Sequence, residues 1–279
     1  MHSTQNDKAK SDKYPMLTPF EDFAKSFDTP ILPFSEIFEK TIKPVVDSPY
    51  LFNSFHWVTN IKEQKLMYVC GVEKLLGYKD DDFTLEKSLD IIHPNYQYFV
   101  VEYALMAYKM LQERRYRSLS SRSHYCIQYP VKRIDGKYIL VQSNVSIIQI
   151  DKDDNPISNY NRFELLGPFL DVPIVIRPRV YFRTVARWED LEIEAENVLS
   201  KRVSIIMLER LKITPRELLI LQDFADDLSS FDITEKQNIG IETVKTHSKK
   251  ILKKARFHLS PNFCNIKEVA LYLKNIDII

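Results

Sequence analysis

Two short capped helices follow one another near the C-terminus, and they constrain the fold of this chain more than any other feature. Thr214 is placed to cap a helix with Pro215 at its first position, and Glu217 can reach back to the cap backbone. Ser229 and Asp232 repeat the capping-box spacing at the start of a second helix. Caps spaced this closely leave room only for short helices, so the pattern predicts a small all-α domain.

A third helix is predicted after the turn 238–240, where Asn and Gly tolerate the backbone of a tight turn. Its two faces differ in chemistry at 100° per residue. One face is mostly apolar and holds Val244, Ser248, Ile251, Leu252 and Ala255. The opposite face holds Thr246 and the lysines Lys245, Lys249, Lys250, Lys253 and Lys254.

This helix concentrates positive charge in a chain whose net charge is only +1. Residues 245–258 contain six Lys or Arg and no Asp or Glu. A basic helical face is often simply solvated surface. Here, however, no acidic residues are interleaved to stabilise the isolated helix, and a phosphate-lined groove explains their absence. The pattern favours DNA binding.

The same residues carry a family resemblance. The segments TPRE (214–217), LS (228–229), ETVKTH (242–247) and ILKK (251–254) resemble the LuxR/GerE-type helix-turn-helix over about residues 211–258. The resemblance implies that the third helix enters the major groove. It implies base-edge positions for Lys245, Thr246 and Lys249, and positions near phosphate for Thr243, His247 and Lys253. Lys250 completes the predicted DNA-binding set. His247 has an alternative role in packing, at the edge of the apolar face.

The middle of the chain predicts strands and helices in a mixed order. Strands are expected at 55–61, 65–72, 124–133, 137–151 and 161–167, with a long helix at 97–112. The motifs LLGY, DDF, IHP and KRIDGKY, between residues 75 and 138, resemble those of PAS domains. This resemblance implies a five-stranded antiparallel sheet, wrapped by helices around a small cavity and used for sensing or dimerisation. The predicted fold class is therefore α+β: a PAS-like domain followed by a small all-α helix-turn-helix domain.

No cofactor or metal site is predicted, although a small-molecule ligand of unknown identity remains open. Trp57, Tyr68, Tyr125 and Tyr138 are candidates for lining a pocket, with core packing as the alternative. The histidines His56, His93 and His124 are interpreted as buried or capping residues, and Cys70 and Cys126 as buried thiols. The acidic run 80–82 is interpreted as a loop and helix cap.

Residues 1–50 are predicted to form a leader with short helices, 51–172 the PAS-like domain, 173–210 a linker with a helix, and 211–279 the helix-turn-helix domain. In the linker helix, Leu191, Val198 and Ile205 repeat every seven residues. A parallel coiled coil and packing against its own domain are both open.

The predicted function is a sequence-specific transcription regulator, a one-component sensor that binds double-stranded DNA as a homodimer, with RNA polymerase as an expected partner. The alternative is a protein-interaction adaptor whose degenerate helix-turn-helix does not bind DNA. An enzyme is not expected, because G-x-S-x-G, metal-ligand spacing and paired carboxylates are all missing. The three distant cysteines and the polar start without an apolar run predict a cytoplasmic protein with no membrane partner.

Overall fold

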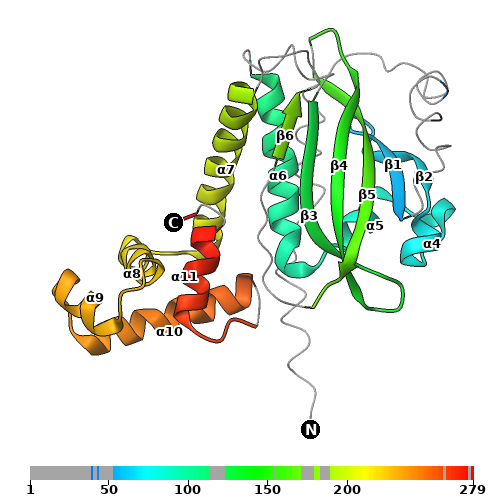
Figure 1. The fold of residues 1–279 in the computed structure, drawn as a ribbon. Coiled ribbons are helices and arrows are strands. Elements are labelled where there is room, and N and C mark those ends of the chain that lie inside the picture. Colours follow the sequence, from blue (N-terminus) through cyan, green and yellow to red (C-terminus); the bar gives the residue numbers. More distant parts are fainter. Residues whose placement is uncertain are drawn as a thin grey trace.

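The computed structural model describes residues 39, 43, 53–113, 123–153, 155–170, 179–182, 189–259, 262–275 and 278–279. These form an antiparallel sheet with helices on one face and a separate group of helices at the C-terminus (Figure 1). The α+β fold class and the all-α C-terminal domain are therefore confirmed. Of the predicted leader, only Glu39 and Lys43 lie within the described residues, and they form an exposed ion pair.

Within the described residues, the sheet has six strands in the order β2-β1-β5-β4-β3-β6. The strands are β1 (Ser54–Asn60), β2 (Lys65–Cys70), β3 (Ser123–Lys132), β4 (Tyr138–Ile150), β5 (Pro156–Pro168) and β6 (Arg179–Phe182). Five of them correspond to the five predicted strands. The sixth, β6, comes from residues that we placed in the linker, and it pairs antiparallel with β3. Val180 is fully buried there, so its burial against the sheet accounts for the pairing.

Short helices and one long helix cover one face of this sheet (Figure 1). They are α4 (Val72–Leu76), the 3-10 turn η3 (Asp80–Asp82), α5 (Leu85–Asp90) and α6 (Pro94–Gln112). Asp80 accepts hydrogen bonds from the backbone N–H groups of Gly71 and Glu73, which confirms a capping role for the first residue of the acidic run. The run itself forms the 3-10 turn η3 and not the predicted loop. His93 caps α6 by accepting a hydrogen bond from the Asn95 N–H at 3.2 Å.

The other two histidines of the sheet domain have polar partners on the opposite face of the sheet. His56 is buried, with Ser54 and Tyr160 hydroxyls 3.0 and 2.6 Å from its ring nitrogens. Burial, and then the positive charge of Arg162, lower the pKa of His56 to about 4, so the ring is neutral at pH 7. His124 bonds to the Ser146 hydroxyl. Among the described residues, no cluster of three or more His, Cys, Asp or Glu could hold a metal ion.

The helix α7 (Glu189–Leu211) packs along α6, as Figure 1 shows. Its buried residues follow a spacing of four: Ala195, Leu199, Val203 and Met207. This stripe differs from the heptad that suggested a coiled coil, since Ile205 is 51% exposed. Packing against its own domain is the alternative that the structure shows. The physical reason is that the spacing of four places small and medium apolar side chains on one face of the helix.

The C-terminal helices are α8 (Pro215–Ala225), α9 (Ser230–Gln237), α10 (Ile241–His258) and α11 (Ile266–Asn275). Both predicted capping boxes are present, at Thr214 with Glu217 and at Ser229 with Asp232. In the turn before α10, Asn238 is left-handed with φ 50°, whereas Gly240 has φ −68° and needs no glycine-specific backbone. Among the described helices, none is long and apolar enough to cross a membrane.

Candidate nucleic-acid interface and ligand cavity

The helix α10 is fixed by its apolar face. Val244, Ile251 and Ala255 are buried, and the helix contacts α8, α9 and α11. Ser248 is half-buried and donates a hydrogen bond to the Val244 carbonyl. Because the apolar residues recur at helical spacing, their burial forces the residues between them outward. The other face of α10 is therefore presented to solvent by a rigid support.

Most of the predicted DNA-binding residues lie on that outer face. The exposed ones are Thr243, Lys245, Thr246, Lys249, Lys250 and Lys253. Within the described part of the chain, Lys249, Lys250 and Lys253 form no ion pair, although the charge of Lys249 helps to lower the pKa of Glu242. Exposed ammonium groups along one helix form a surface suited to phosphate oxygens and to base acceptors.

Lys245 differs from these three because it contacts an acidic neighbour. Its ammonium lies 2.7 Å from the Glu242 carboxylate, and both side chains are largely exposed. The hydrogen bond from Lys245 lowers the pKa of Glu242. Exposed ion pairs of this kind are weak, so a phosphate or a guanine acceptor can displace Glu242.

His247 lies between the two faces of α10. Its side chain is half-buried, and its Nδ1 atom is buried with no hydrogen-bond partner among the described residues. This position agrees with either of its two predicted roles, packing or approach to phosphate.

Lys254 was predicted on the exposed face, and this was wrong. Its ammonium donates to the Glu217 carboxylate and to the Lys212 carbonyl, each at 2.6 Å. Glu217 is the capping residue of α8 and is only 2% exposed. Burial raises the pKa of this carboxyl, but the hydrogen bonds from Lys254 and Thr214 outweigh it and hold the pKa below its usual value. Lys254 thus joins α10 to α8, and its position on the helical wheel could not reveal a partner distant in sequence.

A separate cavity of about 120 Å³ lies between the sheet and its covering helices. Its lining is mainly apolar and includes Trp57, Ile92, Val100, Ala104, Ile127 and Phe163. Of the four aromatic candidates, Trp57 and Tyr125 line it, while Tyr68 and Tyr138 are not among its lining residues. Tyr138 instead packs edge-on against His93, with ring centroids 4.6 Å apart. Among the described lining residues, no side chain carries a charge.

A chain of polar side chains inside this cavity was missed by the sequence reasoning. Asn161 donates hydrogen bonds to Thr59 at 3.3 Å and to Asn159 at 2.7 Å. Asn159 in turn donates to the Tyr108 hydroxyl. The sequence signal that could have revealed these side chains is the alternation of residues along β5. It places Asn159 and Asn161 on the same face as the core residue Phe163. Polar residues on the buried face of a strand indicate a lined cavity.

The C-terminal helices match a known protein family. Residues 211–259 match the family described as "Bacterial regulatory proteins, luxR family". Residues 211–259 form a LuxR-family helix-turn-helix domain. Because such domains belong to DNA-binding transcription regulators, the match supports the general prediction of a DNA-binding regulator. Comparison with curated protein sequences finds no match.

Solved structures give more distant similarities. The N-terminal domain of a diguanylate cyclase with a PAS/PAC sensor from Marinobacter aquaeolei is 18% identical, with a TM-score of 0.33. The alignment covers 41% of this chain and 95% of that one. A Vibrio cholerae VqmA–ligand–DNA complex is 12% identical, with a TM-score of 0.27 and coverage of 89% and 90%. A phage VqmA–DPO complex is 11% identical, with a TM-score of 0.30 and coverage of 87% and 90%.

The LuxR-family domain includes every predicted DNA-binding residue, from Thr243 to Lys253. Its last matched residue, Leu259, precedes α11, so α11 lies beyond the match. The assignment of individual contacts on α10 remains a prediction.

Proposed function

We propose that this protein is a sequence-specific transcription regulator that inserts α10 into the major groove of double-stranded DNA. The observation that carries the proposal is the row of exposed lysines on α10, supported from behind by a buried apolar face. An α-helix fits the major groove, and its lysines can donate to guanine acceptors while the flanking ones contact phosphate. The adaptor alternative gives no comparable reason for the lysine concentration.

Two copies are expected on the DNA. A homodimer would place two copies of α10 on half-sites about one helical turn apart, which is about 34 Å centre to centre. The bound sequence is then a palindrome or a close relative of one.

Selection from random double-stranded DNA with the full chain tests this function. We expect a palindromic motif, bound with an affinity that falls steeply as salt increases. The logarithm of the affinity should fall by about 0.9 per logarithmic unit of salt for each phosphate that is neutralised. Recovery of unrelated sequences with no enrichment, at any salt concentration, would contradict sequence-specific binding.

We also propose that the cavity of the sheet domain binds a small signal molecule. A cavity of about 120 Å³ is of the order that accommodates one aromatic ring. The uncharged lining favours a neutral ligand, because a charge would lose its hydration without gaining a partner. Asn161 uses its N–H groups on Thr59 and Asn159, and its carbonyl oxygen accepts no hydrogen bond within the described part of the chain. A planar, neutral ring with an N–H or O–H donor fits these groups.

Filling the cavity tests this second proposal. In the Ala104→Phe variant, the added ring occupies the space that the ligand would take. A panel of neutral one-ring amides and heteroaromatics should contain a compound that raises the Tm of the wild type and leaves that of Ala104→Phe unchanged. The matched control is Met106→Phe, on the same helix but outside the cavity lining, which should still respond. Equal responses in all three proteins would argue for binding elsewhere.

A further inference from the structure

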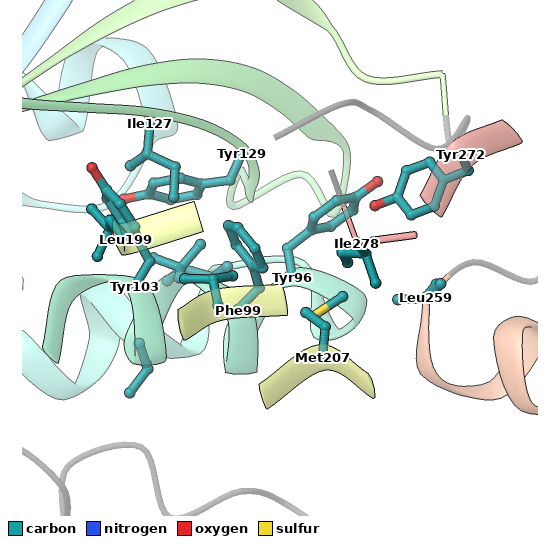
Figure 2. Packing of buried hydrophobic residues seen from close by; sticks show 14 of the residues in the cluster. Tyr96, Phe99, Tyr103, Ile127, Tyr129, Leu199, Met207, Leu259, Tyr272 and Ile278 are labelled. Atoms are coloured by element: carbon teal, nitrogen blue, oxygen red, sulfur yellow. The ribbon is translucent and has the colours of Figure 1, made fainter. Parts of the chain in front are cut away.

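The helix-turn-helix domain is docked on the sheet domain through an apolar contact (Figure 2). Tyr272 of α11 and Ile278 near the C-terminus are buried, and Tyr272 lies beside Tyr96, near the start of α6. Met207 of α7 and Leu259, just after α10, are buried nearby. Burial, and then the neighbouring Tyr96 hydroxyl, raise the pKa of Tyr272. Side chains from both parts of the molecule therefore share one core.

Ile278 is placed between α11 and α7. Its backbone N–H donates to the Leu273 carbonyl at 2.9 Å, which ties the tail back to α11. Its side chain lines a surface groove together with Ser204, Ile205 and Leu208 of α7. Ile278 therefore adds one apolar side chain to the contact that Tyr272 and Leu259 also make, at the edge of the helix-turn-helix domain. Because it lines a surface groove, Ile278 is the member of this contact chosen for substitution.

A second attachment lies at the covalent connection between α7 and α8. Lys212 adopts a left-handed backbone with φ 50°, and its carbonyl accepts the hydrogen bond from Lys254 of α10. One attachment alone would let the domain pivot about the connection. Two attachments, at the connection and at the apolar contact that includes Ile278, fix the orientation of α10 relative to α7.

The helix α6 is common to the cavity and to this contact. Val100 and Ala104 line the cavity, whereas Tyr96, one turn before Val100, lies beside Tyr272 of the docked domain. The helix α7 follows α6 closely, and the Arg210 guanidinium lies 4.2 Å from the centre of the Tyr98 ring. Because a helix moves as a rigid element, a shift at Ala104 also displaces Tyr96.

We propose that the Ile278 contact couples the cavity to DNA binding: a change of cavity occupancy moves α6, and the docked tail transfers this movement to α10. The proposal rests on the proposed function, since it names how the sensor domain regulates the DNA-binding domain. Couplings between sites in proteins typically change affinity by about 5- to 150-fold. A charge at Ile278 would open the apolar contact that Ile278 shares with Tyr272 and Leu259, and the coupling would be lost.

A double-mutant cycle tests the proposal with the full chain and the DNA that the selection yields. Ala104→Phe serves as the probe of a filled cavity, and Ile278→Asp places an unpaired carboxylate in the apolar contact. With Ile278 present, Ala104→Phe should change the Kd for DNA by about fivefold or more. In the Ile278→Asp background, the same substitution should change it by less than about twofold, within the scatter of independent sites. The radius of gyration in solution should rise in Ile278→Asp.

Two further variants keep the outcome interpretable. Ile279→Asp adds the same charge one residue later, where Ile279 lines a different pocket, with Leu219 and Lys274, and is not among the residues of the α7 groove, so the coupling should persist. Ile278→Ala is a milder change, and it serves as the test variant if Ile278→Asp disturbs folding. It should also reduce the coupling. An equal effect of Ala104→Phe with and without the Ile278 contact, or no effect in either background, overturns the coupling. Failure of the wild type to bind DNA would instead overturn the proposed function.

Discussion

Replacing Lys245 and Lys249 together with alanine should weaken binding to the selected DNA by about 100-fold. Each substitution would remove one base contact and with it about 1.4 kcal/mol of binding free energy, which corresponds to a tenfold loss of affinity. Both side chains are exposed, so the fold should be unaffected. The measurement is the Kd on the selected sequence and on a scrambled one. Specificity, the ratio of the two values, should fall along with affinity.

Two comparisons make this result specific to α10. Lys253→Ala removes a predicted phosphate contact, so it should weaken binding to both sequences equally and reduce the salt slope by about 0.9. Lys74→Ala with Lys137→Ala removes the same charge from exposed positions of the sheet domain, and binding should not change. Unchanged DNA affinity in the α10 double variant would favour the adaptor function.

The second large effect is expected on stability. Glu217→Gln should lower the free energy of unfolding by about 3 kcal/mol, the usual cost when a buried ion pair loses one partner. The substitution leaves the ammonium of Lys254, whose side chain is 27% exposed, without its carboxylate. Chemical denaturation of the full chain, followed by circular dichroism, provides the measurement. Glu242→Ala is the control, because its carboxylate is exposed and its loss should matter little.

A double variant separates the charge pair from simple loss of a side chain. Glu217→Gln with Lys254→Met removes both charges, so it should be more stable than Glu217→Gln alone. The 2.6 Å contact indicates that Lys254 and Glu217 stabilise each other. Additive destabilisation by the two substitutions would contradict this.

The same pair makes stability depend on pH. The pKa of Glu217 is lower in the folded protein than in the unfolded chain, where it is about 4.3. Its contribution is therefore fully present above about pH 4.3 and is lost as the pH falls through the folded-state pKa. The difference in stability between wild type and Glu217→Gln should shrink on acidification. A difference that stays constant through this range would contradict the assigned ionisation.

Local patterns were sufficient to predict much of the helix-turn-helix domain. The caps at Thr214 and Ser229 depend on residues three positions apart, so their geometry is contained in the sequence itself. The outward position of Lys249 and Lys253 follows from helical periodicity once Val244 and Ile251 are buried. The alternation of the strands similarly predicted five of the six strands.

Features that depend on distant partners could not be predicted. The sixth strand needed β3 as a partner, from which it is separated by about fifty residues, and so it was placed in the linker. The choice between a coiled coil and packing on α6 depended on which face of α7 met another helix. The burial of Ala195, Leu199, Val203 and Met207 shows which face of α7 meets α6. The polar chain from Thr59 to Tyr108 joins residues of β1, β5 and α6, which meet only in the folded sheet domain.

By itself, the sequence determined the LuxR-family domain and the lysine-rich face of α10, because capping and periodicity act over a few residues of one helix. Only the tertiary structure decided that Lys254 is bound to Glu217 and that Ile278 reaches α7. The same holds for α6, which serves both the cavity and the docked tail. Such contacts depend on how separate elements pack, and packing brings together residues whose distance along the chain carries no local signal.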